Sequence, residues 1–166
     1  MTYRRDLWEQ AAYRHGVFTL DDARDVGVPE VEVRKLASRG VLTGYGNGVY
    51  VHADVPSTRK TEFALAQALV GTTAFLCGQS VFMFHGVGDF NPKQIEVGVA
   101  QRVRRKLPLW INLHLRRDVT EADIVEVDGV RMMHSARALA DMKDVMDEER
   151  FTALGQQVDF LQQQGW

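Results

Sequence analysis

Few side chains in this sequence have the types and spacing that metal binding requires. The candidate soft ligands are Cys77, His85, His114 and His134. Eight positions separate the first two and long gaps separate the others, which matches no zinc-binding pattern. Cys77 is the only cysteine, so an intramolecular disulfide framework is excluded. We therefore expect no metal and no cofactor.

Catalytic patterns are equally sparse. Asp89 followed by Glu96 is typical of restriction-type nucleases, but such sites need a lysine two positions after the glutamate, and none is present. Ser80 and Ser135 lack the context of a nucleophilic serine and are interpreted as helix N-caps. No glycine-rich phosphate loop followed by Lys and Ser or Thr occurs. We predict no catalytic residues and keep a metal-dependent nuclease as an alternative.

A different chemistry, recognition of phosphates and base edges, is available to a helix predicted from Pro29 to Arg39. Val33 and Leu36 face its core side. Its exposed face is expected to carry the DNA-binding side chains Arg34, Lys35, Ser38 and Arg39. Arginine and lysine bind guanine edges and phosphates, and serine binds phosphates. Glu30 and Glu32 on the same helix oppose this, because carboxylates repel phosphate, although they can accept from cytosine amino groups.

Three helices and a hairpin are predicted to position these side chains. The helices cover residues 6–15, 19–27 and 29–39; Thr19 is a good N-cap, and glycine follows or ends each helix. Two short strands then flank Asn47-Gly48, a strong hairpin signal, with Tyr45 and Asn47 exposed near its tip. This order predicts a winged helix-turn-helix, in which one helix enters a major groove ~12 Å wide and the hairpin contacts the adjoining backbone.

The best domain boundary lies near residues 53–57, which gives a DNA-binding domain over 1–54 and a second domain over 57–166. In the second domain we expect two apolar helices, 58–70 and one ending near 85–86. Strands follow at 94–100 and 109–115, then a hairpin at 124–127 and 130–133, and helices at 135–146 and 148–164. The expected fold class is α+β: an N-terminal winged helix-turn-helix followed by a mixed α+β domain with a small antiparallel sheet.

Basic residues also gather in the second domain. They are Arg102, Arg104, Arg105 and Lys106, with Arg116 and Arg117 at the far side of a strand. We expect them to form either an auxiliary patch for phosphates or a partner, or a solvated loop. Each phosphate contact would steepen the salt dependence of DNA affinity by about 0.9 in log–log slope.

The overall charge argues against a polybasic binder. The formal net charge is -2, and the acidic residues concentrate in the last third of the chain, which leaves a nucleic-acid surface further upstream open. No apolar run approaches the ~18 residues of a membrane span, and no apolar stretch follows the basic residues at the N-terminus. We therefore expect a cytoplasmic protein without membrane contact.

Several segments resemble AbiEi-type antitoxins of bacterial toxin–antitoxin systems. Residues 16–23, 33–42 and 48–50 resemble the winged helix of that family, and residues 78–87, 94–99 and 128–142 resemble its C-terminal domain. The resemblance covers about residues 5–145 and depends on the order of the segments. The first turn of the helix at Pro29–Arg39 is more acidic than is typical of the family.

The resemblance implies a non-enzymatic phage-defence (abortive infection) protein. Such a protein represses its own operon by binding inverted repeats in promoter DNA and counteracts a nucleotidyltransferase-like toxin, directly or indirectly. The alternative is a protein-interaction module that restrains a partner enzyme without binding DNA. The apolar face of the last helix fits either packing on its own domain or binding to a partner.

Overall fold

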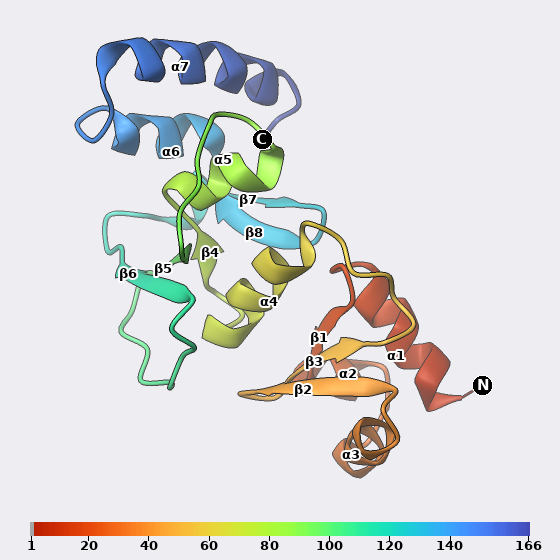
Figure 1. The fold of residues 1–166 in the computed structure, drawn as a ribbon. Helices are drawn as coiled ribbons and strands as arrows, with labels where there is room; N and C mark the ends of the chain where they lie inside the picture. Colours follow the sequence, from red (N-terminus) through yellow and green to blue (C-terminus); the bar gives the residue numbers. More distant parts are fainter. Residues whose placement is uncertain (1) are drawn as a thin grey trace. The chain divides into compact units, whose positions relative to one another are not determined.

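The computed structural model describes residues 2–166, which form a mixed α+β structure with seven α-helices and two sheets (Figure 1). The chain divides into two compact units, the first ending at Thr72 and the second comprising Thr73–Trp166. The division lies later in the chain than the expected boundary near residues 53–57, because helix α4 (Thr61–Val70) packs against strands of the first unit.

The first unit contains a three-stranded antiparallel sheet of order β1-β3-β2. Its strands are β1 (Val17–Thr19), β2 (Leu42–Gly46) and β3 (Val49–His52). Its helices, besides α4, are α1 (Tyr3–Ala12), α2 (Leu20–Asp25) and α3 (Glu30–Ser38). The predicted helices and hairpin are confirmed, whereas β1 was not predicted because three residues are too short for a visible alternation.

Local sequence explains these elements. Thr19 forms a capping box with Asp22, in which each side chain accepts from the other residue's backbone N–H. Asn47 and Gly48 both have positive φ, as a two-residue turn between Gly46 and Val49 requires. The core of the unit collects apolar side chains from the helices and strands: Leu7, Ala11, Phe18, Ala23, Val28, Val33 and Leu42.

The second unit is built on a five-stranded sheet of order β6-β5-β4-β8-β7. The strands are β4 (Phe75–Leu76), β5 (Ile95–Val99), β6 (Ile111–Leu115), β7 (Ile124–Val127) and β8 (Val130–Met133). The predicted antiparallel sheet is wrong: β5–β6 and β4–β8 pair in parallel, and only β4–β5 and β7–β8 are antiparallel. The long segment between β5 and β6 returns the chain so that both strands run the same way.

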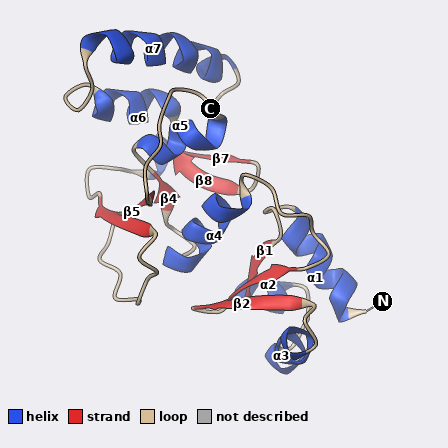
Figure 2. Ribbon diagram, in the orientation of Figure 1, coloured by secondary structure: helices blue, strands red, loops and turns tan. Residues whose placement is uncertain are grey.

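Three helices and a 3-10 turn complete the second unit: α5 (Gln79–His85), η1 (Glu121–Asp123), α6 (Ser135–Met142) and α7 (Glu148–Gln163). Helices α6 and α7 lie side by side (Figure 2). Leu154, Val158 and Leu161 of α7 are buried. No helix in residues 2–166 combines the length and apolar composition needed to cross a membrane.

The predicted serine N-caps are wrong. His134, not Ser135, caps α6 through its Nδ1, and the Ser135 hydroxyl donates to the Trp166 carbonyl. Ser80 lies inside α5, where its Oγ accepts from the Glu96 N–H. In both cases the hydroxyl bonds a distant segment, and a cap assigned from neighbouring residues cannot reveal such a bond.

Candidate nucleic-acid interface

Helix α3 presents a polar face to solvent. Pro29 precedes the helix in extended conformation and Val33 is buried beneath it. The side chains of Arg34 and Lys35 are 68% and 54% exposed. Both cations are therefore accessible, as the sequence predicts.

Each of these two cations is paired with a glutamate on the same helix. The Arg34 Nη2 lies 2.5 Å from Glu30 Oε1, and the Lys35 Nζ lies 3.0 Å from Glu32 Oε1. The hydrogen bond and the charge of Glu30 raise the pKa of the Arg34 guanidinium above its already high value. Exposed pairs of this kind contribute little to stability, so a phosphate can compete for the cation.

The C-terminal end of α3 carries the other two predicted contacts. The Ser38 hydroxyl donates to the Lys35 carbonyl at 2.7 Å, while remaining exposed. Arg39 is the C-cap residue and is exposed. Arg39 is the one α3 cation among the described residues for which no carboxylate partner is observed.

The β2–β3 hairpin places Tyr45 and Asn47 at its exposed end, with Tyr45 47% accessible. The Asn47 side chain donates to the Leu69 carbonyl of α4 at 3.3 Å. The prediction of an exposed hairpin tip is confirmed, but the Asn47 amide already has a partner inside the first unit. Tyr45 is the better placed of the two for an external contact.

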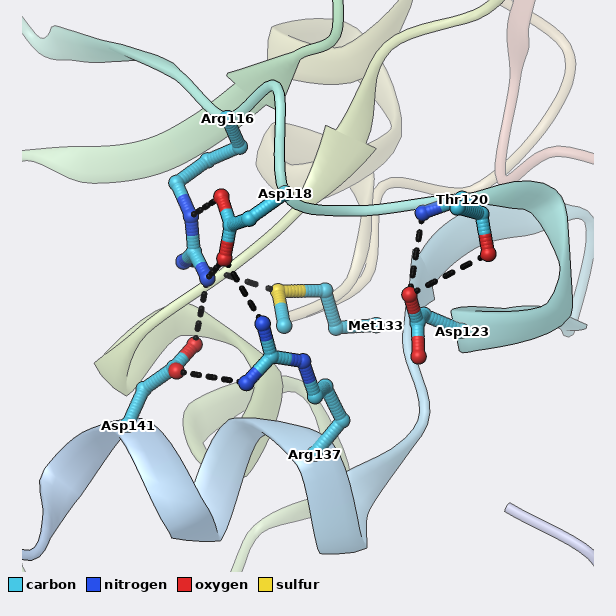
Figure 3. Close-up of polar contacts among 7 residues, drawn as sticks. All are labelled: Arg116, Asp118, Thr120, Asp123, Met133, Arg137 and Asp141. Atoms are coloured by element: carbon cyan, nitrogen blue, oxygen red, sulfur yellow. Dashed lines mark hydrogen bonds and ion pairs between the residues drawn. The ribbon is translucent and has the colours of Figure 1, made fainter.

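Arg116 does not belong to an open basic patch. Its guanidinium donates twice to Asp118, at 3.0 and 2.9 Å, and contacts Asp141 of α6 at 2.9 Å. Arg137 donates to the same two carboxylates (Figure 3). This four-residue network holds the segment after β6 against α6, and its charges balance internally.

The remaining members of the predicted patch are exposed around β5 and β6. Arg102 follows β5 and Arg117 follows β6, and since these strands are parallel neighbours, both residues lie at the same end of the strand pair. Arg102 also lines a pocket of 470 Å³ together with Thr73, Phe75 and Thr120. Arg104, Arg105 and Lys106 are exposed in the β5–β6 connection.

Glu96, the glutamate of the Asp89–Glu96 pair, is largely enclosed. Its carboxylate accepts from the Gln79 N–H at 2.8 Å and lies 3.2 Å from His114 Nε2. Gly78 passes so close that a Cβ there would lie 2.3 Å from the carboxylate. These contacts occupy the carboxylate and give Glu96 a structural role beside α5.

The side chains considered as metal ligands do not form a metal-binding group. In residues 2–166 no group of three or more His, Cys, Asp or Glu side chains is arranged to hold a metal ion. Cys77 is buried, and burial, reinforced by the charge of Glu96, raises the pKa of its thiol to about 12. A thiol in this state is a poor ligand and a poor nucleophile.

Comparison with known proteins adds no assignment: the sequence matches no protein-family model and no curated protein.

Sequence reasoning missed the Arg116–Asp118–Arg137–Asp141 network. Only the i,i+4 spacing of Arg137 and Asp141 signals part of it. It also missed the pairing of α3 cations with glutamates, although the spacings of Glu30–Arg34 and Glu32–Lys35 are those of helical ion pairs.

Proposed function

We propose that the first unit is a winged helix-turn-helix that binds duplex DNA through α3 and the β2–β3 hairpin. We propose further that the chain is an AbiEi-type antitoxin that represses its own operon. In this proposal α3 lies in the major groove and Tyr45 contacts the adjoining backbone. The second unit counteracts a nucleotidyltransferase-like toxin, directly or indirectly.

The observation that carries the proposal is the order of elements in the first unit. Helices α2 and α3 are joined by a short turn at residues 26–29, and a two-stranded hairpin follows α3. Strand β1, between α1 and α2, pairs with β3, so the base of the hairpin is anchored to the helices. This arrangement suits a helix that enters a groove while its neighbours brace it.

The ion pairs of α3 can be exchanged for contacts with DNA phosphates. Glu30 and Glu32 hold Arg34 and Lys35 in exposed pairs, and DNA phosphates compete for the same cations. Arg39 has no observed carboxylate partner among the described residues, so it can bind a phosphate without first leaving an ion pair. We therefore expect modest affinity for a single site and a need for two copies on an inverted repeat.

The second candidate function is a protein-interaction module that restrains a partner enzyme. The pairing of Arg34 and Lys35 within α3 favours it, because a neutralised helix face suits a polar protein surface better than a polyanion.

Fluorescence anisotropy with labelled DNA from upstream of the operon separates these functions. Wild-type protein should bind this duplex more tightly than a scrambled duplex. Arg34→Ala with Lys35→Ala should weaken binding at least about tenfold. Lys93→Ala with Lys143→Ala removes the same charge from exposed sites of the second unit and should leave affinity unchanged.

The antitoxin assignment needs its own test. A nucleotidyltransferase-like reading frame overlapping the 3′ end of the gene should arrest growth when expressed alone and be tolerated when this protein is co-expressed. If Arg34→Ala with Lys35→Ala changes neither promoter output nor protection from the toxin, the interaction-module function is favoured. Growth arrest that this protein does not relieve would contradict the antitoxin assignment.

A further inference from the structure

Strand β6 forms one edge of the five-stranded sheet, with β5 on its inner side. Two hydrogen bonds fix which residues face β5: the Ile95 N–H donates to the Trp110 carbonyl, and the Arg116 N–H donates to the Val99 carbonyl. With the register Ile95↔Ile111, the backbone groups of Asn112 and His114 therefore face β5. Those of Ile111, Leu113 and Leu115 face outward.

The outward edge is open over its C-terminal half. The Ile111 N–H donates to Pro108, but within the described chain no backbone hydrogen bond is observed for the outward groups of Leu113 and Leu115. An open edge with free N–H and C=O groups is a template for another strand. Leu115 is also 42% exposed and Leu109, just before β6, is 93% exposed, so apolar contact area accompanies the free backbone.

Cations lie at the C-terminal end of this edge. Arg117 follows the strand and is exposed, and Arg102 lies at the same end. Acidic groups on an incoming strand would meet positive charge at this end of β6.

The same charges disfavour a second copy of this chain as the occupant. In antiparallel pairing of two β6 strands centred on Leu113, Arg117 of each copy would lie opposite Leu109 of the other. Its charge would meet an apolar side chain there, whereas an acidic strand would supply a carboxylate.

We propose that the β6 edge binds an acidic, extended peptide segment of a partner protein by antiparallel strand addition. The inference goes beyond DNA binding and does not depend on it. Leu113 and Leu115 exchange backbone hydrogen bonds with the residues opposite them, and the cations at the C-terminal end of the edge select acidic sequences.

Amide hydrogen exchange followed by NMR tests whether the edge is open. In the free protein the N–H groups of Leu113 and Leu115 should exchange much faster than those of Asn112 and His114. A synthetic peptide of alternating Glu and Val, with blocked ends, should slow exchange at Leu113 and Leu115. If these two amides are already protected in the free protein, the edge is covered and the proposal fails.

Backbone methylation of the peptide tests the mode of binding. With valines opposite Leu113 and Leu115, the valine N–H groups donate to β6 and the glutamate N–H groups point away. N-methylation of the valines should therefore abolish binding, whereas N-methylation of the glutamates should not. Equal effects of the two modifications, or no binding of the unmodified peptide, would overturn the proposal.

Charge selection is tested on the protein. Arg117→Glu should weaken peptide binding about fivefold at low salt, the scale of reversing one exposed charge pair. Lys143→Glu makes the same reversal on the α6–α7 connection and should have no effect. A Lys-Val peptide that binds as tightly as the Glu-Val peptide would contradict an acidic partner.

Discussion

The proposed contact of α3 with DNA depends on how tightly Glu30 holds Arg34. Their side chains are 42% and 68% exposed and their charged atoms lie 2.5 Å apart. Replacing Glu30 by glutamine removes a carboxylate that repels phosphate and frees the guanidinium from its charged partner.

Glu30→Gln should therefore tighten DNA binding several-fold, as measured by anisotropy at low salt. Glu9→Gln is the matched control, because Glu9 pairs with Arg5 at the same i,i+4 spacing on α1. The gain should disappear in an Arg34→Ala background. A Glu30→Gln variant with unchanged or weaker affinity would mean that Arg34 does not contact DNA.

We expect Asp118 to make the stability of the second unit depend on pH in the acidic range. Hydrogen bonds from Arg116 hold the pKa of Asp118 at about 2, below its ordinary 3.8. A carboxylate with a lowered pKa in the folded state adds stability above its unfolded pKa, and this stability is lost as the pH falls from about 3.8 to about 2.

The free energy of unfolding should accordingly fall through this acidic range, as chemical denaturation at several pH values would measure. Asp118→Asn should lower stability at neutral pH and flatten the acidic fall. A wild-type and an Asp118→Asn protein with parallel pH profiles would show that Asp118 contributes nothing through its charge.

Cys77 reports on opening of the second unit. Its side chain is buried and the pKa of its thiol is raised to about 12, so almost none is thiolate at neutral pH. A disulfide reagent such as dithionitrobenzoate should react at a rate set by unfolding and faster in denaturant. Reaction of native protein at the rate of a free thiol would contradict this environment.

At the scale of elements, the His52 side chain links the end of β3 to α1 by a hydrogen bond. The ring is fully buried; its Nε2 lies 3.0 Å from the Arg4 carbonyl and its Nδ1 accepts from the Asp54 N–H. These bonds require a neutral ring with the proton on Nε2.

His52→Ala should destabilise the first unit by about 2–4 kcal/mol, because it leaves a cavity and unpaired backbone groups. Hydrogen exchange in the full chain should show faster exchange in α1 and β3, with the second unit unchanged. Ala12→Gly, at an exposed position of α1, should cost only about 1 kcal/mol and serves as the comparison. Similar losses for both variants would rule out this linking role.

Most elements could be predicted from the sequence, because their signals are local. Thr19 marks the start of α2, and the Asn47-Gly48 and Asp128-Gly129 turns define both hairpins. Strand β4 could not be predicted, since two residues carry no alternation. Parallel pairing of β4 with β8 also leaves no local signal, because it joins segments more than fifty residues apart.

The residues of the candidate site could be predicted from the sequence, but their ion pairs could not. The exposed positions of Arg34, Lys35, Ser38 and Arg39 follow from the helical period. The position of Arg116 in a closed network does not, because Asp141 approaches it only after α6 packs beside the end of β6.

At the scale of the whole molecule, the two units carry different candidate binding surfaces. The first carries the α3 face and hairpin, and the second carries the charge-balanced network and the open β6 edge. Proposed DNA binding and proposed peptide binding thus lie in separate units, and variants of one should leave the other unchanged.

Methylation protection by dimethyl sulfate tests the central claim most directly, because the reagent attacks guanine N7 in the major groove. On DNA from upstream of the operon, we expect protected guanines in two half-sites about one helical turn apart, lost on Arg34→Ala with Lys35→Ala. Binding without N7 protection, or protection that survives the double substitution, would contradict the placement of α3 in the groove.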